Sequence, residues 1–208
     1  MDRPNGQSGR TNKRHDDSTS VQSARPTRQL LLDAAAELIA ELGWGQVTTR
    51  AIAERAGLPH GAVSYHFQGK QELLTEAALQ AVERLFPLDE LATIKTLENL
   101  LPLIQSWLGA PDSTNSVGAD VLLEAMREAK RNPSLRRRLA MILRDYRQVV
   151  AELAHAEQFR GAIRAAPTST ALATLIAAVG DGLLLHLMLD PELNAADAAA
   201  ALLTLLRA

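Results

Sequence analysis

Cysteine is absent from this 208-residue chain, and aromatic residues make up only 3% of it. Without thiols the chain has no disulfide, no cysteine-based zinc site and no thiol nucleophile, which suits a reducing compartment. We therefore expect a cytoplasmic protein held together by a hydrophobic core, for which a chain of this length is ample.

Motifs of the common enzyme classes are also missing. The five histidines show no zinc-ligand spacing, no glycine-rich phosphate loop precedes a helix, and no nucleophile motif is present. The stretch "QGKQE", residues 68–72, contains Gly-Lys but not the rest of a P-loop. We expect a protein that is not an enzyme and that holds neither a metal nor a cofactor.

The net charge of −2 conceals an uneven distribution. Residues 1–28 hold six Lys and Arg against three Asp and Glu, whereas residues 29–208 hold 16 against 21. Residues 1–25 have almost no large apolar side chain, so we expect a disordered polar tail, either simply solvated or reaching along DNA. No apolar stretch follows its basic residues, which argues against a signal peptide.

The most apolar stretch covers residues 171–190, where Asp181 and His186 interrupt the run. A lipid-facing aspartate is costly, so this stretch is predicted to be a buried or interfacial helix rather than a membrane span.

Apolar residues recur with helical spacing from Thr27 onward, which predicts an all-α fold. Gly43 is expected to end a first helix in the left-handed conformation. The apolar stripe of this helix consists of Leu30, Leu31, Ala34, Leu38 and Leu42. Asn132 and Pro133 mark one later start, as cap and first-turn residue. Later helices are predicted at 89–108, 117–131, 133–157, 168–189 and 195–207, with a loop at 109–118.

Residues 48–67, "TTRAIAERAGLPHGAVSYHF", contain two short predicted helices joined by a tight turn. Thr48 or Thr49 caps the first helix, Gly57 ends it, and Pro59 opens the second. Two short helices around a glycine turn form a helix-turn-helix motif.

The second short helix is expected to bury Val63 and Phe67, which lie four residues apart on one face. Its opposite face carries polar groups and small residues, which suit entry into a DNA major groove. The residues expected on that face are His60, Gly61, Ser64 and Tyr65.

Lys70 follows Gly69, the expected cap of a fourth helix, and stands in the first turn. A lysine there opposes the helix dipole, which points to an external anion such as a DNA phosphate. A solvated lysine is the alternative.

Residues 28–79 resemble the DNA-binding domain of the tetracycline-repressor (TetR) family of bacterial regulators. The resemblance rests on an ordered set: the threonine pair, "IAERAG" before the turn, Gly61, the Tyr-His-Phe run, and Lys70 followed by Leu73. It implies a three-helix helix-turn-helix domain over 26–85 and a helical ligand-binding and dimerisation domain over 86–208.

The resemblance also implies roles for single residues. Thr48 and Thr49 hold phosphate, Tyr65 and Lys70 contact the DNA backbone, and Ser64 replaces a tyrosine that many members carry. The full set of implied DNA-binding residues is Thr48, Thr49, Arg50, His60, Gly61, Ala62, Ser64, Tyr65, His66 and Lys70.

Residues 29–85 hold four Lys and Arg against seven Asp and Glu, which is unusual for a DNA-binding region. We therefore expect the acidic side chains to lie off the contact face, at Asp33, Glu37, Glu41, Glu72 and Glu76.

By the same resemblance, a homodimer binds a pseudo-palindromic operator on double-stranded DNA, and a small-molecule effector releases it. The expected dimer face comprises small and apolar residues of the 168–189 helix, Ala173, Ala177, Gly180 and Leu184. An internal core helix in a monomer is the alternative.

Candidate effector-binding residues in the second domain are large, polarizable or polar, and ordinary core packing is the favoured alternative for each. They are Trp107, Met126, Met141, Tyr146, Asp181 and His186. Arg136, Arg137 and Arg138 point in different directions on a helix, so we interpret them as a solvated face or ion-pair partners rather than a second DNA site.

The sequence therefore predicts a ligand-responsive transcriptional regulator, and the family resemblance implies that it is a repressor. The alternative is a helical protein–protein interaction module whose helix-turn-helix does not bind DNA.

Overall fold

The structure is a computed structural model that describes residues 26–100, 114–165, 167–190 and 192–207. Within these ranges the chain is helical and has no β-strand, apart from an isolated antiparallel bridge between Ile163 and Arg207. The predicted all-α class is confirmed. The predicted tail and Trp107 lie outside the described residues.

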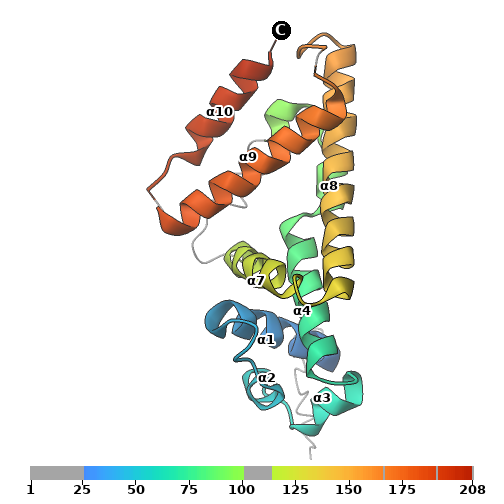
Figure 1. Cartoon of the computed structure of the whole chain (residues 1–208), viewed down its shortest axis with the longest axis vertical. Coiled ribbons are helices and arrows are strands. Elements are labelled where there is room, and N and C mark those ends of the chain that lie inside the picture. Colours follow the sequence, from blue (N-terminus) through green and yellow to red (C-terminus); the bar gives the residue numbers. More distant parts are fainter. Residues whose placement is uncertain (1–25, 101–113, 166, 191, 208) are drawn as a thin grey trace, which may run out of the picture.

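Three helices form one end of the molecule, which we call the head (Figure 1). They are α1 (Thr27–Leu42), α2 (Thr49–Arg55) and α3 (Gly61–His66). Helix α4 (Lys70–Leu85) packs on α1 and leads out of the head. The head core is tightly closed, because Leu31, Ile39, Val47, Ile52, Leu73 and Leu74 are all fully buried.

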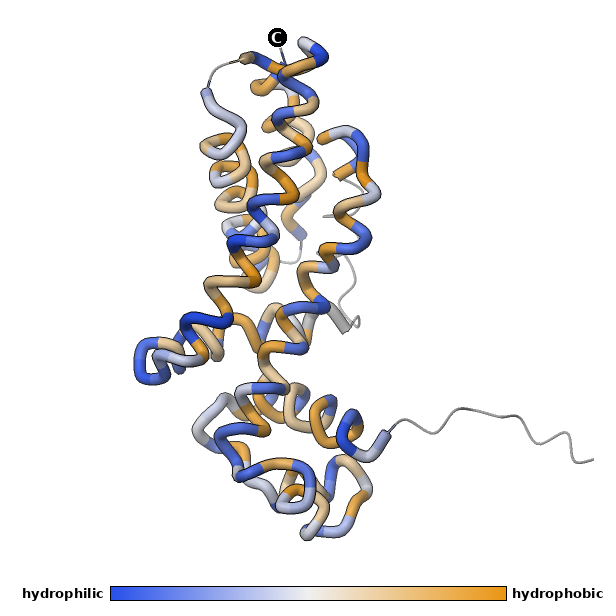
Figure 2. The backbone as a smooth tube through the Cα atoms, turned by 90° about the vertical axis from the view of Figure 1, so that its right-hand side faces the viewer, coloured by the Kyte–Doolittle hydropathy of each residue, from blue (hydrophilic) through white to orange (hydrophobic). Residues whose placement is uncertain are grey.

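The remaining helices form the body, at the other end of α4. They are α5 (Leu88–Thr93), α7 (Thr114–Glu128), α8 (Pro133–Phe159), α9 (Ser169–Leu189) and α10 (Ala195–Leu206). Residues 97–100 are also helical. Helix α8 runs along the body with α9 packed against it, and α10 lies beyond α9 (Figure 1). Hydrophilic and hydrophobic positions alternate along α8, as a helix half-buried against its neighbours requires (Figure 2).

Capping explains why the later helices begin where the sequence predicts. The Asn132 side chain accepts hydrogen bonds from the backbone N–H groups of Ser134 and Leu135 at 3.1 and 3.0 Å, and Pro133 occupies the first turn. Likewise, the Thr168 hydroxyl accepts from the N–H of Ala171 at 3.3 Å and starts α9. These side chains satisfy N–H groups that a helix start leaves free.

The predicted helix over 89–108 is wrong in its middle. The chain leaves the helical conformation at Ile94, whose ψ is 135°, and the Thr96 hydroxyl then accepts from the N–H of Asn99 at 3.2 Å. The predicted loop over 109–118 is also wrong at its end, because α7 already begins at Thr114.

The apolar stripe predicted for α1 is correct at Leu31, Ala34 and Leu38, which are buried. Leu42, which was expected in the stripe, is 51% exposed. Ile39, which was not, is fully buried in the core. Gly43, with a φ of +78°, ends the helix as predicted.

Candidate DNA-binding surface

The turn between α2 and α3 depends on a glycine. Gly57 has a φ of +68°, and Leu58 N–H reaches back to the carbonyl of Ala53 at 2.8 Å. This bond closes the end of α2, and α3 begins four residues after Gly57. The helix-turn-helix arrangement predicted from the sequence is therefore present.

Helix α3 has a buried face and an exposed face. Val63 and Phe67 are 2% and 4% exposed and anchor the helix in the head core. Tyr65 is 85% exposed. Ala62 differs from the expected outward-facing position, because it is partly buried against the core. The residues of α3 and its cap that are exposed are His60, Gly61, Ser64 and Tyr65.

Tyr65 is positioned by its neighbour rather than by the core. Its ring meets the ring of His66 edge-on, with centroids 4.9 Å apart and planes at 88°. His66 is half-buried, so it supports the tyrosine from the side of the head. The phenol is thus presented to solvent on a braced aromatic ring.

Two helix starts flank α3 along the chain. The Thr48 hydroxyl caps α2 by accepting from the Ala51 N–H at 3.1 Å, which decides between the two threonines predicted as cap. Gly69 precedes α4, and Lys70 is the first residue of that helix, as predicted. Thr48, Thr49 and Arg50 are exposed and Lys70 is half-buried.

Arginines of the head and of α4 are occupied in ion pairs. The Arg55 guanidinium pairs with Glu41 through two contacts of 2.7 Å and with Glu37 at 3.2 Å. Both hydrogen bonds raise the pKa of Arg55, and the one with Glu41 has the larger effect. The same hydrogen bond from Arg55 lowers the pKa of Glu41. Arg84 pairs with Asp33 at 2.9 Å.

The cations left for an external partner are few. Among the described residues of the head and α4, Arg50 and Lys70 form no ion pair. Both stand in the first turn of a helix, where unpaired backbone N–H groups add partial positive charge. A phosphate at either helix start would meet both contributions.

Five of the seven acidic residues in 29–85 are engaged with other groups of the protein. Glu37, Glu41 and Asp33 on α1 bind arginines, as described above. On α4, Glu76 pairs with Arg28, and the Glu72 carboxylate accepts the N–H of Gln68. The nearby arginines therefore offset the local negative charge of Glu76, Glu41 and Asp33.

Arg28 was not predicted to have a role here. Its guanidinium lies 5.0 Å from the centroid of the Phe67 ring while pairing with Glu76. Arg28 thereby joins the start of α1 to α4 and covers the residue that anchors α3. The sequence signal for this role was a basic residue at the start of α1. Its aromatic partner, Phe67, lies far away in the chain, so the contact could not be predicted.

The residues predicted to bind an effector do not form one pocket. Met126 and Met141 are each 55% exposed, and Asp181 and His186 are also exposed, so none of these lines a closed cavity. Each of these residues lies on a helix that has one side in solvent. The amphipathic pattern of the sequence alone did not show that these residues face that side.

Tyr146 and Asp181 are the exception, because the structure brings them within electrostatic reach. Tyr146 is 5% exposed, with its ring centroid 5.0 Å from that of Phe86. Burial, and after it the charge of Asp181, raises the pKa of Tyr146 to about 12. Desolvation raises the pKa of Asp181, while the positive charge of Arg147 lowers it.

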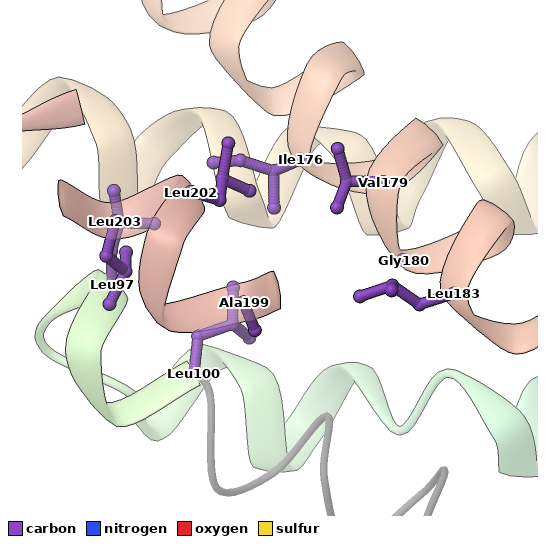
Figure 3. Close-up of a pocket in the computed structure, with 9 residues that line it drawn as sticks. All are labelled: Leu97, Leu100, Ile176, Val179, Gly180, Leu183, Ala199, Leu202 and Leu203. Atoms are coloured by element: carbon purple, nitrogen blue, oxygen red, sulfur yellow. The ribbon is translucent and has the colours of Figure 1, made fainter. Parts of the chain in front are cut away.

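A different set of residues lines an apolar groove in the body (Figure 3). It is lined by the helical stretch 97–100, α9 and α10, through Leu97, Leu100, Ile176, Val179, Gly180, Leu183, Ala199, Leu202 and Leu203. The groove holds about 390 Å³ of empty space including its open side, and its cavity is narrow, about 20 Å³. A ligand larger than a water molecule must therefore widen it.

Two of the four residues predicted for the dimer face are already buried within the single chain. Ala173 and Ala177 are 0% and 8% exposed within the single chain, where α9 packs on α8. Their small side chains let α8 approach α9 closely. Gly180 and Leu184 are half-buried, and Gly180 lines the apolar groove.

Another face of α9, together with α10, exposes large apolar residues. They are Leu175, Leu185, Met188, Leu189 and Leu205. Within the described residues, α9 is the one helix with the length and apolarity of a membrane span. Because it packs along α8 in a helical bundle, we interpret it as a bundle helix with one uncovered face.

A head with a braced, polar-faced α3, joined to a helical body, defines a helix-turn-helix transcriptional regulator. The family model for bacterial regulatory proteins of the tetR family matches residues 31–77. The model for the C-terminal part of BetI-type transcriptional repressors matches residues 98–208. The chain therefore belongs to the TetR family of bacterial transcriptional regulators.

Individual relatives agree with this assignment. The repressor Rv1474c of Mycobacterium tuberculosis is 28% identical over 110 residues, which cover 53% of this chain and 54% of that protein. The chain thus spans about half the length of this curated relative.

Solved structures match over a larger share of the chain. A transcriptional regulator of Saccharomonospora viridis in complex with choline matches with a TM-score of 0.71 and 27% identity, over 85% of this chain and 93% of that one. The regulator FadR of Bacillus subtilis in complex with stearoyl-CoA has the same fold, with a TM-score of 0.67 and 21% identity over 86% and 97%.

Proposed function

We propose that the protein represses transcription by binding a pseudo-palindromic operator as a homodimer, and that a small molecule releases it. Residues 26–85 bind DNA, and residues 86–208 bind the effector and form the dimer. The exposure of Tyr65 on a helix anchored by Val63 and Phe67 carries this proposal, because a core-packed or flexible helix could not enter a groove with its polar face outward.

In this proposal α3 reads the major groove with His60, Gly61 and Ser64, and Ala62 contributes through its exposed part. The two flanking helix starts hold phosphates, with Thr48, Thr49 and Arg50 at α2 and Lys70 at α4. Tyr65 and His66 contact the DNA backbone beside α3.

The hydrocarbon part of the effector occupies the groove between α9 and α10. All nine lining residues are aliphatic or glycine, so a small cation such as the choline of one structural neighbour meets no aromatic ring or acid among them. An acyl chain, as in the stearoyl-CoA of another neighbour, matches this lining. Widening of the narrow groove would move α10 relative to α9, and so couple the ligand to the dimer.

Fluorescence anisotropy on intergenic DNA upstream of its own gene tests the DNA-binding part. Lys70→Ala should weaken binding and reduce the slope of log affinity against log salt by about 1 per subunit, because one phosphate contact is lost. Tyr65→Ala should weaken binding by about 1 kcal/mol or more, the cost of a lost phosphate contact.

Gln71→Ala is the matched control, since Gln71 is exposed and uncharged beside Lys70. It should leave both affinity and salt slope unchanged. A wild-type protein that binds no DNA at low salt, or a Tyr65→Ala Lys70→Ala variant that binds like wild type, would overturn the proposal.

A further inference from the structure

Helix α7 touches both the head and α4, and so lies where the body meets the DNA-binding part. It approaches α4 closely at Gly118, where a Cβ atom would lie 3.3 Å from the carbonyl oxygen of Ala81 and 3.5 Å from Cβ of Leu85. Any larger residue would push the two helices apart. The position of α7 against α4 is therefore closely fixed.

Two turns along α7, Glu124 reaches the head. Its Oε2 accepts the backbone N–H of Trp44 at 3.1 Å, across 80 residues of sequence. Its Oε1 is 3.2 Å from Nη1 of Arg127. Among the described residues this is the one hydrogen bond that joins the head to the body.

The turn that receives this bond is built around the carboxylate. Gly43 has a φ of +78°, and a Cβ there would lie 3.3 Å from Oε2 of Glu124. Glycine is thus needed at this position both for the backbone conformation and for the approach of Glu124. The Glu124 side chain is only 24% exposed, so the bond is partly shielded from water.

Trp44 connects this hydrogen bond to the core of the head. It is 5% exposed in the core, and its indole N–H has no partner among the described residues. Its polar link is therefore the backbone N–H held by Glu124. Val47, fully buried, and then Thr48, the cap of α2, follow within the same short stretch.

We infer that Glu124 is a positioning residue for DNA binding: it holds the α1–α2 turn, and with it the phosphate-facing start of α2, in a fixed place relative to the body. In addition to the packing of α7 on α1, one charge-assisted hydrogen bond passes movement of α7 to this turn. This inference rests on the proposed DNA binding and adds the contact through which the body controls it.

Two variants of nearly equal length separate the hydrogen bond from packing. Glu124→Gln keeps an oxygen that accepts the Trp44 N–H, whereas Glu124→Met removes it. Glu124→Met should speed amide hydrogen exchange at Trp44 about tenfold and weaken binding to the upstream DNA about fivefold. Glu124→Gln should stay within about twofold of wild type in both measurements, since its amide oxygen is still an acceptor.

Arg127→Ala is the matched control, because it removes the salt-bridge partner of Glu124, 82% exposed, and leaves the acceptor in place. It should behave like Glu124→Gln. Unchanged helicity and dimer mass in all three variants show that the fold persists. If Glu124→Met does not fold, faster Trp44 exchange and weaker binding in Glu124→Asp, whose carboxylate is one methylene short of the Trp44 N–H, test the same contact.

Unchanged DNA affinity in Glu124→Met despite faster Trp44 exchange would overturn the inference, because the bond would then be structural only. Equal losses in Arg127→Ala would overturn it too, by showing that charge rather than the bond is responsible. Absence of DNA binding by the wild type would instead reject the proposed function, while the exchange of Trp44 still reports whether the bond exists.

Discussion

Tyr146 lies buried beside Phe86 and is the residue whose ionisation most clearly affects folding. Its pKa is raised to about 12 by burial and by the charge of Asp181, from an ordinary value of about 10. The folded chain therefore holds the phenolic proton more tightly than the unfolded chain does. The resulting stability is fully present below pH ~10 and is lost as the pH rises toward ~12.

Tyr146→Phe should remove this part of the alkaline loss. In the wild type the free energy of unfolding should fall by about 2 kcal/mol between pH ~10 and ~12 from this residue alone. Urea unfolding at both pH values measures the loss, and other groups that titrate there contribute equally to both proteins. Tyr65→Phe, at an exposed tyrosine, should retain the wild-type loss; an equal slope in all three proteins would contradict the assignment.

Single residues of the head were predictable where local spacing decides their environment. Val63 and Phe67 are one helical turn apart, so burying one buries the other, and Tyr65 must then face away. The pairing of Arg55 with Glu37 and Glu41 depends instead on how α2 packs across α1, which spacing within one helix does not determine. For the same reason Glu124 and its bond to Trp44 were not predicted.

Helix α9 has three faces, and a period of 3.6 residues alone does not assign them. Ala173 and Ala177 face α8, Val179 and Leu183 face the groove, and Leu185 is exposed. Small residues predict a close helix neighbour, and within the single chain Ala173 and Ala177 have α8 as that neighbour. Strong caps, such as Asn132 before α8, were predictable because the signal lies in adjacent residues.

Gly180 offers a test of the groove at the level of the helix. A Cβ built there meets no atom within 4 Å, and the same holds for Gly182, which does not line the groove. Gly180→Leu should place a side chain in the groove and weaken binding of the apolar dye Nile red about tenfold. Gly182→Leu should bind the dye within about twofold of wild type, because this residue lies outside the groove. It is a matched control, since both variants replace a helical glycine by leucine and gain similar helix propensity.

Displacement of the dye by stearate then addresses the ligand class. Competition in the wild type that is lost in Gly180→Leu supports an acyl chain in the groove. Equal dye binding by both leucine variants would contradict this location for the effector, without bearing on DNA binding.

Across the whole molecule, the head lies at one end, and α9 and α10 lie in the body away from it (Figure 1). A lone α3 offers few contacts, whereas two copies related by a two-fold axis reach successive major grooves ~34 Å apart. Leu185 and Leu205, 47% and 72% exposed, belong to the face that a second chain would cover. The spacing of the two α3 helices is then set by the packing of α9 and α10.

Leu185→Glu should therefore produce a monomer with a folded head. Placing a carboxylate in an apolar interface costs several kcal/mol when it is left unpaired. Sedimentation equilibrium should show half the wild-type mass, and affinity for a two-site operator should fall at least ~100-fold because the second head no longer binds intramolecularly. Met141→Glu, at a 55% exposed residue of α8 outside this face, should remain dimeric and bind normally. A wild-type protein that is monomeric at concentrations where it binds DNA would contradict the two-fold arrangement.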